Sequence, residues 1–143
     1  MCDLSVHLCI CASVYVCSGD FLFTQAKEWG LRVYEQDWLD DQFLYVRQAQ
    51  ANVTVAQRWL DGLAAGAARH DLFVQLCMPM PRHVLSSVAY PAVTQARATG
   101  DFEPNTGQWR VGYTAPLLAA LGLAPLKDTF WTSSEQTINS YYT

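Results

Sequence analysis

The sequence lacks the basic surface of a nucleic-acid-binding protein. It contains nine Lys and Arg residues against thirteen Asp and Glu residues, which gives a net charge of −4. The basic residues are dispersed along the chain and form no cluster. Because binding to a phosphate backbone depends on such a cluster, we do not expect nucleic acid as a partner.

The sequence also lacks the spacing of a structural metal site and the motif of a serine hydrolase. Four of its five cysteines lie within the first 17 residues: Cys2, Cys9, Cys11 and Cys17. Neither these residues nor Cys77 form the CxxC or Cys/His spacing of a zinc site. Ser86 and Ser87 have no nucleophile-elbow glycines around them. We therefore expect no metal and no cofactor, and serine chemistry is not predicted.

Residues 1–17 form an atypical apolar, Cys-rich leader that differs from the rest of the chain. The segment is as apolar as a signal peptide, but it has no Lys or Arg and carries Asp3 and His7. Its longest apolar run is too short to span a bilayer as a helix, so no membrane span is expected. The sequon at Asn52 would bear on a secreted protein, but it falls inside a predicted helix.

Residues 18–143 have the composition of one globular unit, with 51% hydrophobic and 15% charged residues across the chain. Strand and helix patterns alternate, which is typical of an α/β protein with a parallel sheet. Strands are predicted at Leu31–Trp38, Leu72–Met78, Val93–Ala98 and Pro125–Phe130. Because parallel crossovers are short and right-handed, we predict that these strands lie side by side in chain order.

Helical patterns fill the intervals between the predicted strands. They cover residues 20–29, 41–69, 82–87 and 113–121. Gly30 is expected to end the first helix in the left-handed conformation. The spacing of apolar residues predicts a single long helix over 41–69, which would pack on the outside of the sheet.

Polar and acidic residues gather where three of the predicted strands end. The segments are Glu35-Gln36-Asp37-Trp38, Arg97-Ala98-Thr99-Gly100-Asp101-Phe102 and Lys127-Asp128-Thr129-Phe130-Trp131. The carboxyl ends of parallel strands meet at one edge of a sheet, where α/β enzymes place their reactive groups. These segments are therefore the candidate site.

In this order, the three segments resemble the catalytic half of the α-galactosidase and raffinose-synthase superfamily of retaining glycoside hydrolases. That family has a nucleophilic Asp after its fourth barrel strand, an acid/base Asp four residues after an Arg at the sixth, and an Asp-Met-Phe-like segment at the seventh. The resemblance runs from about Phe21 to Trp131. It implies a partial (β/α)8 TIM barrel of about four βα units. Glu35 and Lys127 depart from the family, which usually has Lys and often has Trp at these positions.

The resemblance implies that Asp37 is the nucleophile and Asp101 the acid/base residue for a carbohydrate with an α-linked sugar. Retaining glycosidases need two carboxyl groups about 5–5.5 Å apart. The residues predicted to contact the substrate are Glu35, Trp38, Met78, Arg97, Asp128 and Trp131. Glu35 points to the same side of its strand as Asp37, so it is a competing nucleophile.

Several of these residues also have purely structural interpretations. Asp37 could be a surface acid, and Asp101 could serve only in a turn. Taken singly, the tryptophans at positions 38, 109 and 131 are more typical of a core. His83, after the second strand, is more typical of a hydrogen-bonded structural residue than of a catalyst.

Two other functions remain open. The chain could be a truncated, non-catalytic copy that binds carbohydrate or a protein partner, because four βα units leave two sheet edges unpaired and a complete barrel needs about 250 residues. For the same reason we expect little turnover from the 143-residue chain. It could also be an unrelated barrel enzyme that converged on acidic strand ends.

Overall fold

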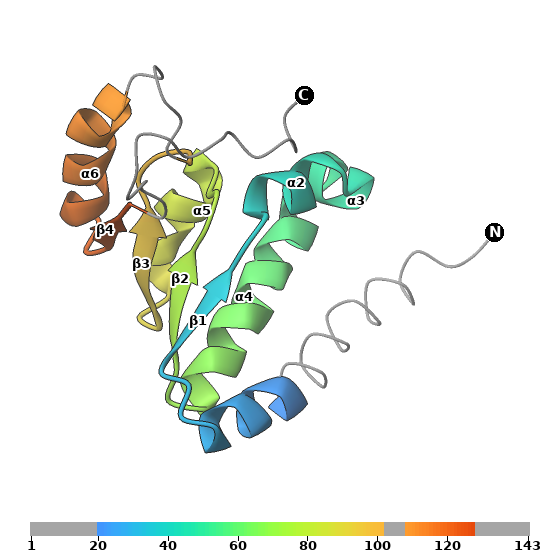
Figure 1. Ribbon diagram of the computed structural model, residues 1–143. Coiled ribbons are helices and arrows are strands. Elements are labelled where there is room, and N and C mark those ends of the chain that lie inside the picture. The colour runs from blue at the N-terminus through green and yellow to red at the C-terminus, as the bar shows by residue number, and fades with distance from the viewer. Residues whose placement is uncertain (1–19, 102–107, 128–143) are drawn as a thin grey trace, which may run out of the picture.

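The computed structural model describes residues 20–101 and 108–127, and they contain a four-stranded parallel sheet (Figure 1). Its strands are β1 (Val33–Gln36), β2 (Phe73–Leu76), β3 (Val93–Arg97) and β4 (Ala124–Leu126), paired in chain order. The predicted α/β class and the order and direction of the strands are therefore confirmed. The observed strands are shorter than predicted, and residues 128–130 of the fourth lie outside the described ranges.

Helices occupy the intervals between the strands. Residues 20–28 are helical, and Gly30 follows with a φ of 94°, as predicted. The later helices are α2 (Leu39–Leu44), α3 (Arg47–Ala51), α4 (Val53–Arg69), α5 (Pro81–Ser86) and α6 (Val111–Ala120), with 3₁₀ turns η1 (Ser87–Ala89) and η2 (Gln108–Arg110). Within the described ranges, no helix combines the length and the apolar character needed to cross a bilayer.

The prediction of one long helix over residues 41–69 is wrong, because the chain forms three helices there. Val46 and Asn52 have extended backbones and separate α2, α3 and α4. The Asn52 side chain accepts a hydrogen bond from the backbone N–H of Thr54 at 2.9 Å. Asn stabilises a helix start in this way, whereas it weakens a helix interior. Asn52 is thus an exposed residue at a helix junction and is not inside a helix, which corrects the interpretation of the sequon.

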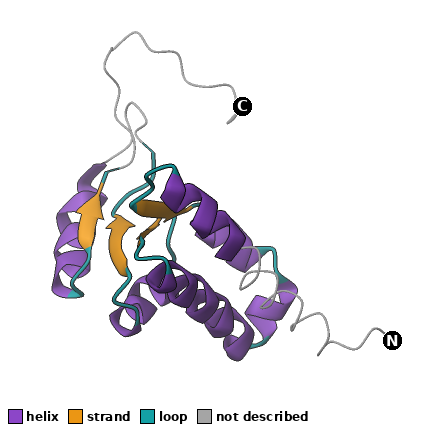
Figure 2. Cartoon of the chain, turned by 90° about the horizontal axis from the view of Figure 1, so that it is seen from below, coloured by secondary structure: helices purple, strands orange, loops and turns teal. Residues whose placement is uncertain are grey.

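The hydrophobic core lies between one face of the sheet and the helices. Its members include Val74 and Leu76 of β2, Ala96 of β3, Leu63 and Ala67 of α4, Val84 of α5 and Leu118 of α6. Figures 1 and 2 both show α6 beside β4, at the opposite edge of the sheet from β1. Burial of a side chain such as Leu76 contributes about 1.5–3 kcal/mol, so this face provides the main stabilisation of the described fold.

The opposite face of the sheet is polar toward its carboxyl end. Glu35, Gln75 and Gln95 are aligned across β1, β2 and β3 by the strand register. Glu35 is exposed and the two glutamines are half-buried. Phe73, nearer the amino end of this face, is 48% exposed. The candidate site lies on this polar face.

The interpretation of the tryptophans as core residues is wrong for the two that the structure describes. Trp38 is 53% exposed and Trp109 is 88% exposed. Trp38 follows β1 in the left-handed conformation, with a φ of 57°, and Trp109 lies in η2, ahead of α6. Trp131 lies outside the described residues.

Candidate active site at the carboxyl ends of β1, β2 and β3

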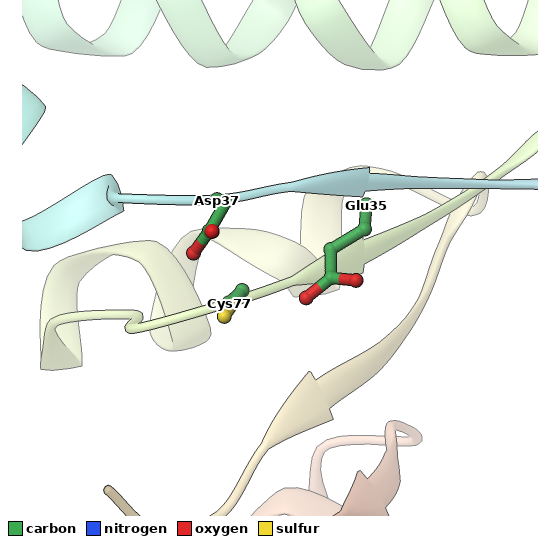
Figure 3. A group of neighbouring side chains, drawn as sticks. All are labelled: Glu35, Asp37 and Cys77. Atoms are coloured by element: carbon green, nitrogen blue, oxygen red, sulfur yellow. The ribbon is translucent and has the colours of Figure 1, made fainter. Parts of the chain in front are cut away.

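Asp37, Cys77 and Arg97 follow or end three neighbouring strands and share the polar face. Gln36 of β1 is paired with Leu76 of β2, and the N–H of Cys77 donates to the Gln36 carbonyl at 3.0 Å. The Cys77 Sγ and one carboxylate oxygen each from Asp37 and Glu35 all lie within 4.8 Å of one another. Figure 3 shows the three side chains on the side of β1 that faces away from α4.

Asp37 and Glu35 are two residues apart, and both carboxylates reach the region around Cys77 (Figure 3). Glu35 is exposed, whereas Asp37 is half-buried. The expectation from strand periodicity that the two acids lie on the same side is therefore confirmed. Their proximity leaves both as candidate nucleophiles, with Asp37 nearer the strand end.

Neutral amides hold the backbone at Asp37. Its carbonyl accepts hydrogen bonds from the Nε2 groups of Gln36 and Gln42, both at 3.1 Å. Its carboxylate accepts from the backbone N–H of Trp38 at 2.8 Å. Gln36 is only 4% exposed, and its amide oxygen also accepts from Tyr34. Gln36 belongs to a predicted site segment, but its contact with the Asp37 carbonyl and that of Gln42 were not predicted, although a Gln on the core side of a strand signals a polar group that needs partners.

The chain turns sharply after both β1 and β2. Trp38 and Met78 have φ values of 57° and 49°, a conformation that costs a non-glycine residue about 1–2 kcal/mol. The N–H of Asp40 donates to the Met78 carbonyl at 3.1 Å, which ties the two turns together. Strained residues of this kind concentrate at functional sites, where surrounding contacts hold them. Asp40 and Asp41 lie in the first turn of α2, where acidic side chains interact favourably with the helix dipole.

Cys77 is a buried thiol between charged neighbours. It is 1% exposed, and its pKa is raised to about 12, chiefly because burial disfavours the charged thiolate. Hydrogen bonds to the carboxylates of Asp37 and Glu35 contribute to the raised pKa, whereas the guanidinium of Arg97 opposes the rise. Cys77 is therefore protonated at neutral pH and can donate to a carboxylate. Its place in the site was not predicted, although it directly precedes the predicted site residue Met78.

Arg97 connects Cys77 to the second candidate carboxylate, Asp101. Its side chain is 2% exposed and forms an ion pair with Asp101. Its Nη1 donates to Cys77 Sγ at 3.4 Å, and its Nε donates to the Thr99 carbonyl at 2.7 Å. Contacts thus run from Asp37 through Cys77 and Arg97 to Asp101. The structure brings the two predicted catalytic residues to the same edge of the sheet.

The remaining predicted residues divide into two groups. Trp38 and Met78 flank the site at the ends of β1 and β2, whereas Asp128 and Trp131 lie outside the described residues.

His83 is buried, and its Nδ1 accepts from the N–H of Met80 at 3.0 Å. The pKa of His83 is lowered to about 4, chiefly by burial and in addition by the charge of Arg82. A neutral, hydrogen-bonded His83 fits the structural interpretation.

Glu35, Asp37 and Cys77 also form the one group, within the described ranges, whose donors are close enough to ligate a single cation. Carboxylate oxygens and thiolate sulfurs are suitable zinc ligands. A cysteine must lose its proton to ligate, and the raised pKa of Cys77 opposes this loss. The donor set therefore favours a hydrogen-bonded thiol over a metal ligand.

Comparison with known proteins gives no match: no family model, no curated protein and no solved structure matches the chain. The resemblance to the α-galactosidase and raffinose-synthase superfamily thus stays an expectation carried by the three strand-end segments. Function is inferred below from the geometry of the strand ends.

Proposed function

We propose that this chain is a glycoside hydrolase-like protein that acts on α-linked sugars by a retaining two-carboxylate mechanism, with no cofactor or metal. One observation carries the proposal. Asp37 and Asp101 follow β1 and β3, which are separated by one strand, and a continuous set of contacts through Cys77 and Arg97 joins them. Two carboxylates at one edge of a parallel sheet are the groups that glycoside hydrolysis requires.

The arrangement of the sheet supports a partial (β/α)8 TIM barrel of about four βα units. All four strands are parallel and neighbours in chain order. Consecutive βα units of a barrel have this order, whereas doubly wound sheets reverse their strand order at a switch point. The polar face that carries Glu35, Gln75 and Gln95 would then be the barrel interior.

In this mechanism Asp37 attacks the anomeric carbon while Asp101 gives a proton to the leaving oxygen. Asp101 then takes a proton from the water that releases the sugar from Asp37. The protonated thiol of Cys77 would orient the Asp37 carboxylate by hydrogen bonding. Trp38, which is exposed beside Asp37, offers an aromatic face to the apolar side of a sugar ring.

The second candidate function is a non-catalytic carbohydrate-binding copy. Its support is the polar face, on which Glu35 is exposed and Gln75 and Gln95 are half-buried. Within the described sheet, β1 and β4 each have a strand neighbour on one side only. Loops from all sides of a barrel position a sugar for reaction, so a partial sheet would retain binding more readily than turnover.

Covalent trapping separates the two functions. A 5-fluoro-α-glycosyl fluoride, with galactosyl and glucosyl forms compared, transfers its sugar to a nucleophile, and the ring fluorine slows release of that sugar. We expect intact-mass spectrometry to show one added sugar and peptide mapping to place it on Asp37. A label on Glu35 would move the nucleophile there. Saturable sugar binding by calorimetry without any label would establish the binding module.

A further inference from the structure

The turn that carries Asp101 is held from both sides of its peptide backbone. On the β3 side, Arg97 donates from Nε to the Thr99 carbonyl at 2.7 Å and forms an ion pair with Asp101. One guanidinium thus fixes both the backbone before Asp101 and the carboxylate itself. The planar fork of Arg suits such paired contacts.

On the β4 side, two adjacent residues hold the same turn. The carbonyl of Leu126 accepts from the N–H of Ala98 at 2.9 Å. Lys127 Nζ donates to the Gly100 carbonyl at 3.0 Å. Because Arg97 holds the Thr99 carbonyl, consecutive carbonyls of the turn each accept from a different cationic side chain.

The hydrogen bond from Lys127 matters because it restrains a glycine, Gly100. A Cβ at this position would meet nothing within 4 Å, so the glycine is not packed against a neighbour. Glycine has the largest backbone freedom of any residue, and it directly precedes Asp101. The hydrogen bond to its carbonyl therefore restricts the peptide that sets the position of the carboxylate.

We propose that Lys127 is a positioning residue, which fixes the Gly100 peptide so that Asp101 meets the leaving oxygen during proton transfer. The inference rests on the proposed function and adds to it a residue that acts through the backbone next to Asp101. Displacement of a reacting group by 1 Å costs about 100-fold in rate. Loss of the Lys127 contact should consequently slow proton transfer and leave nucleophilic attack unchanged.

The test compares two covalent reagents on the full chain. In an α-configured cyclitol epoxide, an oxygen of Asp37 bonds to the ring carbon while the C–O bond of the epoxide breaks, and the released oxygen takes the proton of Asp101 to become a hydroxyl. The 5-fluoro-α-glycosyl fluoride loses fluoride and needs no such proton. The ratio of the two labelling rates, followed by intact-mass spectrometry, therefore reports on proton transfer alone.

Lys127→Met should slow epoxide labelling by about 10-fold or more while the fluoride rate changes less than about 2-fold. Lys127→Arg should restore the epoxide rate, since Arg can also donate to the Gly100 carbonyl. Lys27→Met is the matched control, because Lys27 Nζ likewise donates to a backbone carbonyl, that of Asp71 at 2.7 Å, before β2. Neither of its rates should change.

Three outcomes contradict the inference. An unchanged epoxide rate in Lys127→Met, or equal slowing with both reagents, overturns the positioning role and leaves the proposed function standing. If neither reagent labels the unaltered chain, the proposed function fails and the positioning role fails with it. Circular dichroism of each variant checks that the fold is retained.

Discussion

The ends of β1 and β3 hold their aspartates with opposite kinds of partner. At β1, the neutral amides of Gln36 and Gln42 hold the backbone of Asp37, and no cationic side chain within residues 20–101 and 108–127 forms an ion pair with its carboxylate. At β3, the cation of Arg97 pairs with the Asp101 carboxylate itself. A neighbouring cation stabilises the ionised form of a carboxyl group, whereas neutral hydrogen bonds to the backbone fix its position without adding charge. The two ends therefore differ in what holds the aspartate, and the roles proposed for Asp37 and Asp101 can be tested against that difference.

Neutralising each aspartate in turn is the most direct test of whether the two strand ends differ in role. Asp37→Asn should abolish covalent labelling by the 5-fluoro-α-glycosyl fluoride, because no carboxylate remains to attack. Asp101→Asn should keep that labelling and slow epoxide labelling by about 100-fold or more, because general acid catalysis contributes about 10²–10⁴-fold. Mass spectrometry measures both rates. Equal loss in the two variants would mean that the two ends do not differ in role.

Cys77, which lies between the two ends, tests the electrostatics of the site. Its raised pKa, about 12 against 9.0 for the ordinary thiol, lowers the thiolate fraction at pH 8.5 by about 1000-fold, so alkylation should be slower by about this factor in the folded chain than in urea. Since the folded state holds this proton more tightly, its contribution to stability is complete below pH 9 and is lost as pH rises toward 12.

Peptide mapping after timed alkylation measures Cys77 separately from the cysteines of residues 1–17. Urea unfolding of Cys77→Ala at pH 7 and pH 10 supplies the second measurement, because this variant should lack the part of the alkaline loss that the thiol causes. Rapid alkylation of the native chain would show that Cys77 is not enclosed by its neighbours.

The smallest expected effect is on the free energy of unfolding, when a contact is removed at either strand end. Arg97→Met leaves Asp101 and Cys77 without a cationic partner and should lower the free energy of unfolding by about 2–3 kcal/mol. Gln42→Ala removes one neutral hydrogen bond to the Asp37 carbonyl and should cost about 0.5–1.5 kcal/mol. Urea titration of both variants gives the comparison. A larger loss for Gln42→Ala would reverse the assignment of the more strongly held end.

Much of the fold and part of the site could be predicted from local patterns. Alternating strand and helix signals gave four strands with the correct order and direction. The period of two placed Glu35 and Asp37 on one side of β1. The helix break at Asn52 was missed, because capping competed with an apolar spacing that continued across it. The partners of Asp37 were missed too, because Gln42 reaches back from the next helix.

What the sequence determined by itself was the set of elements, since periodicity, Gly30 and the polar strand ends are properties of neighbouring residues. Only the tertiary structure decided that Arg97 lies beside Cys77. The pairing of β2 with β3 shifts by one residue between Val74 and Gln75. Without that shift, Arg97 would align with Met78, and a one-residue change of register moves a side chain to a different neighbour. Such a shift depends on how two strands pack against the same helices, which no local stretch of sequence encodes.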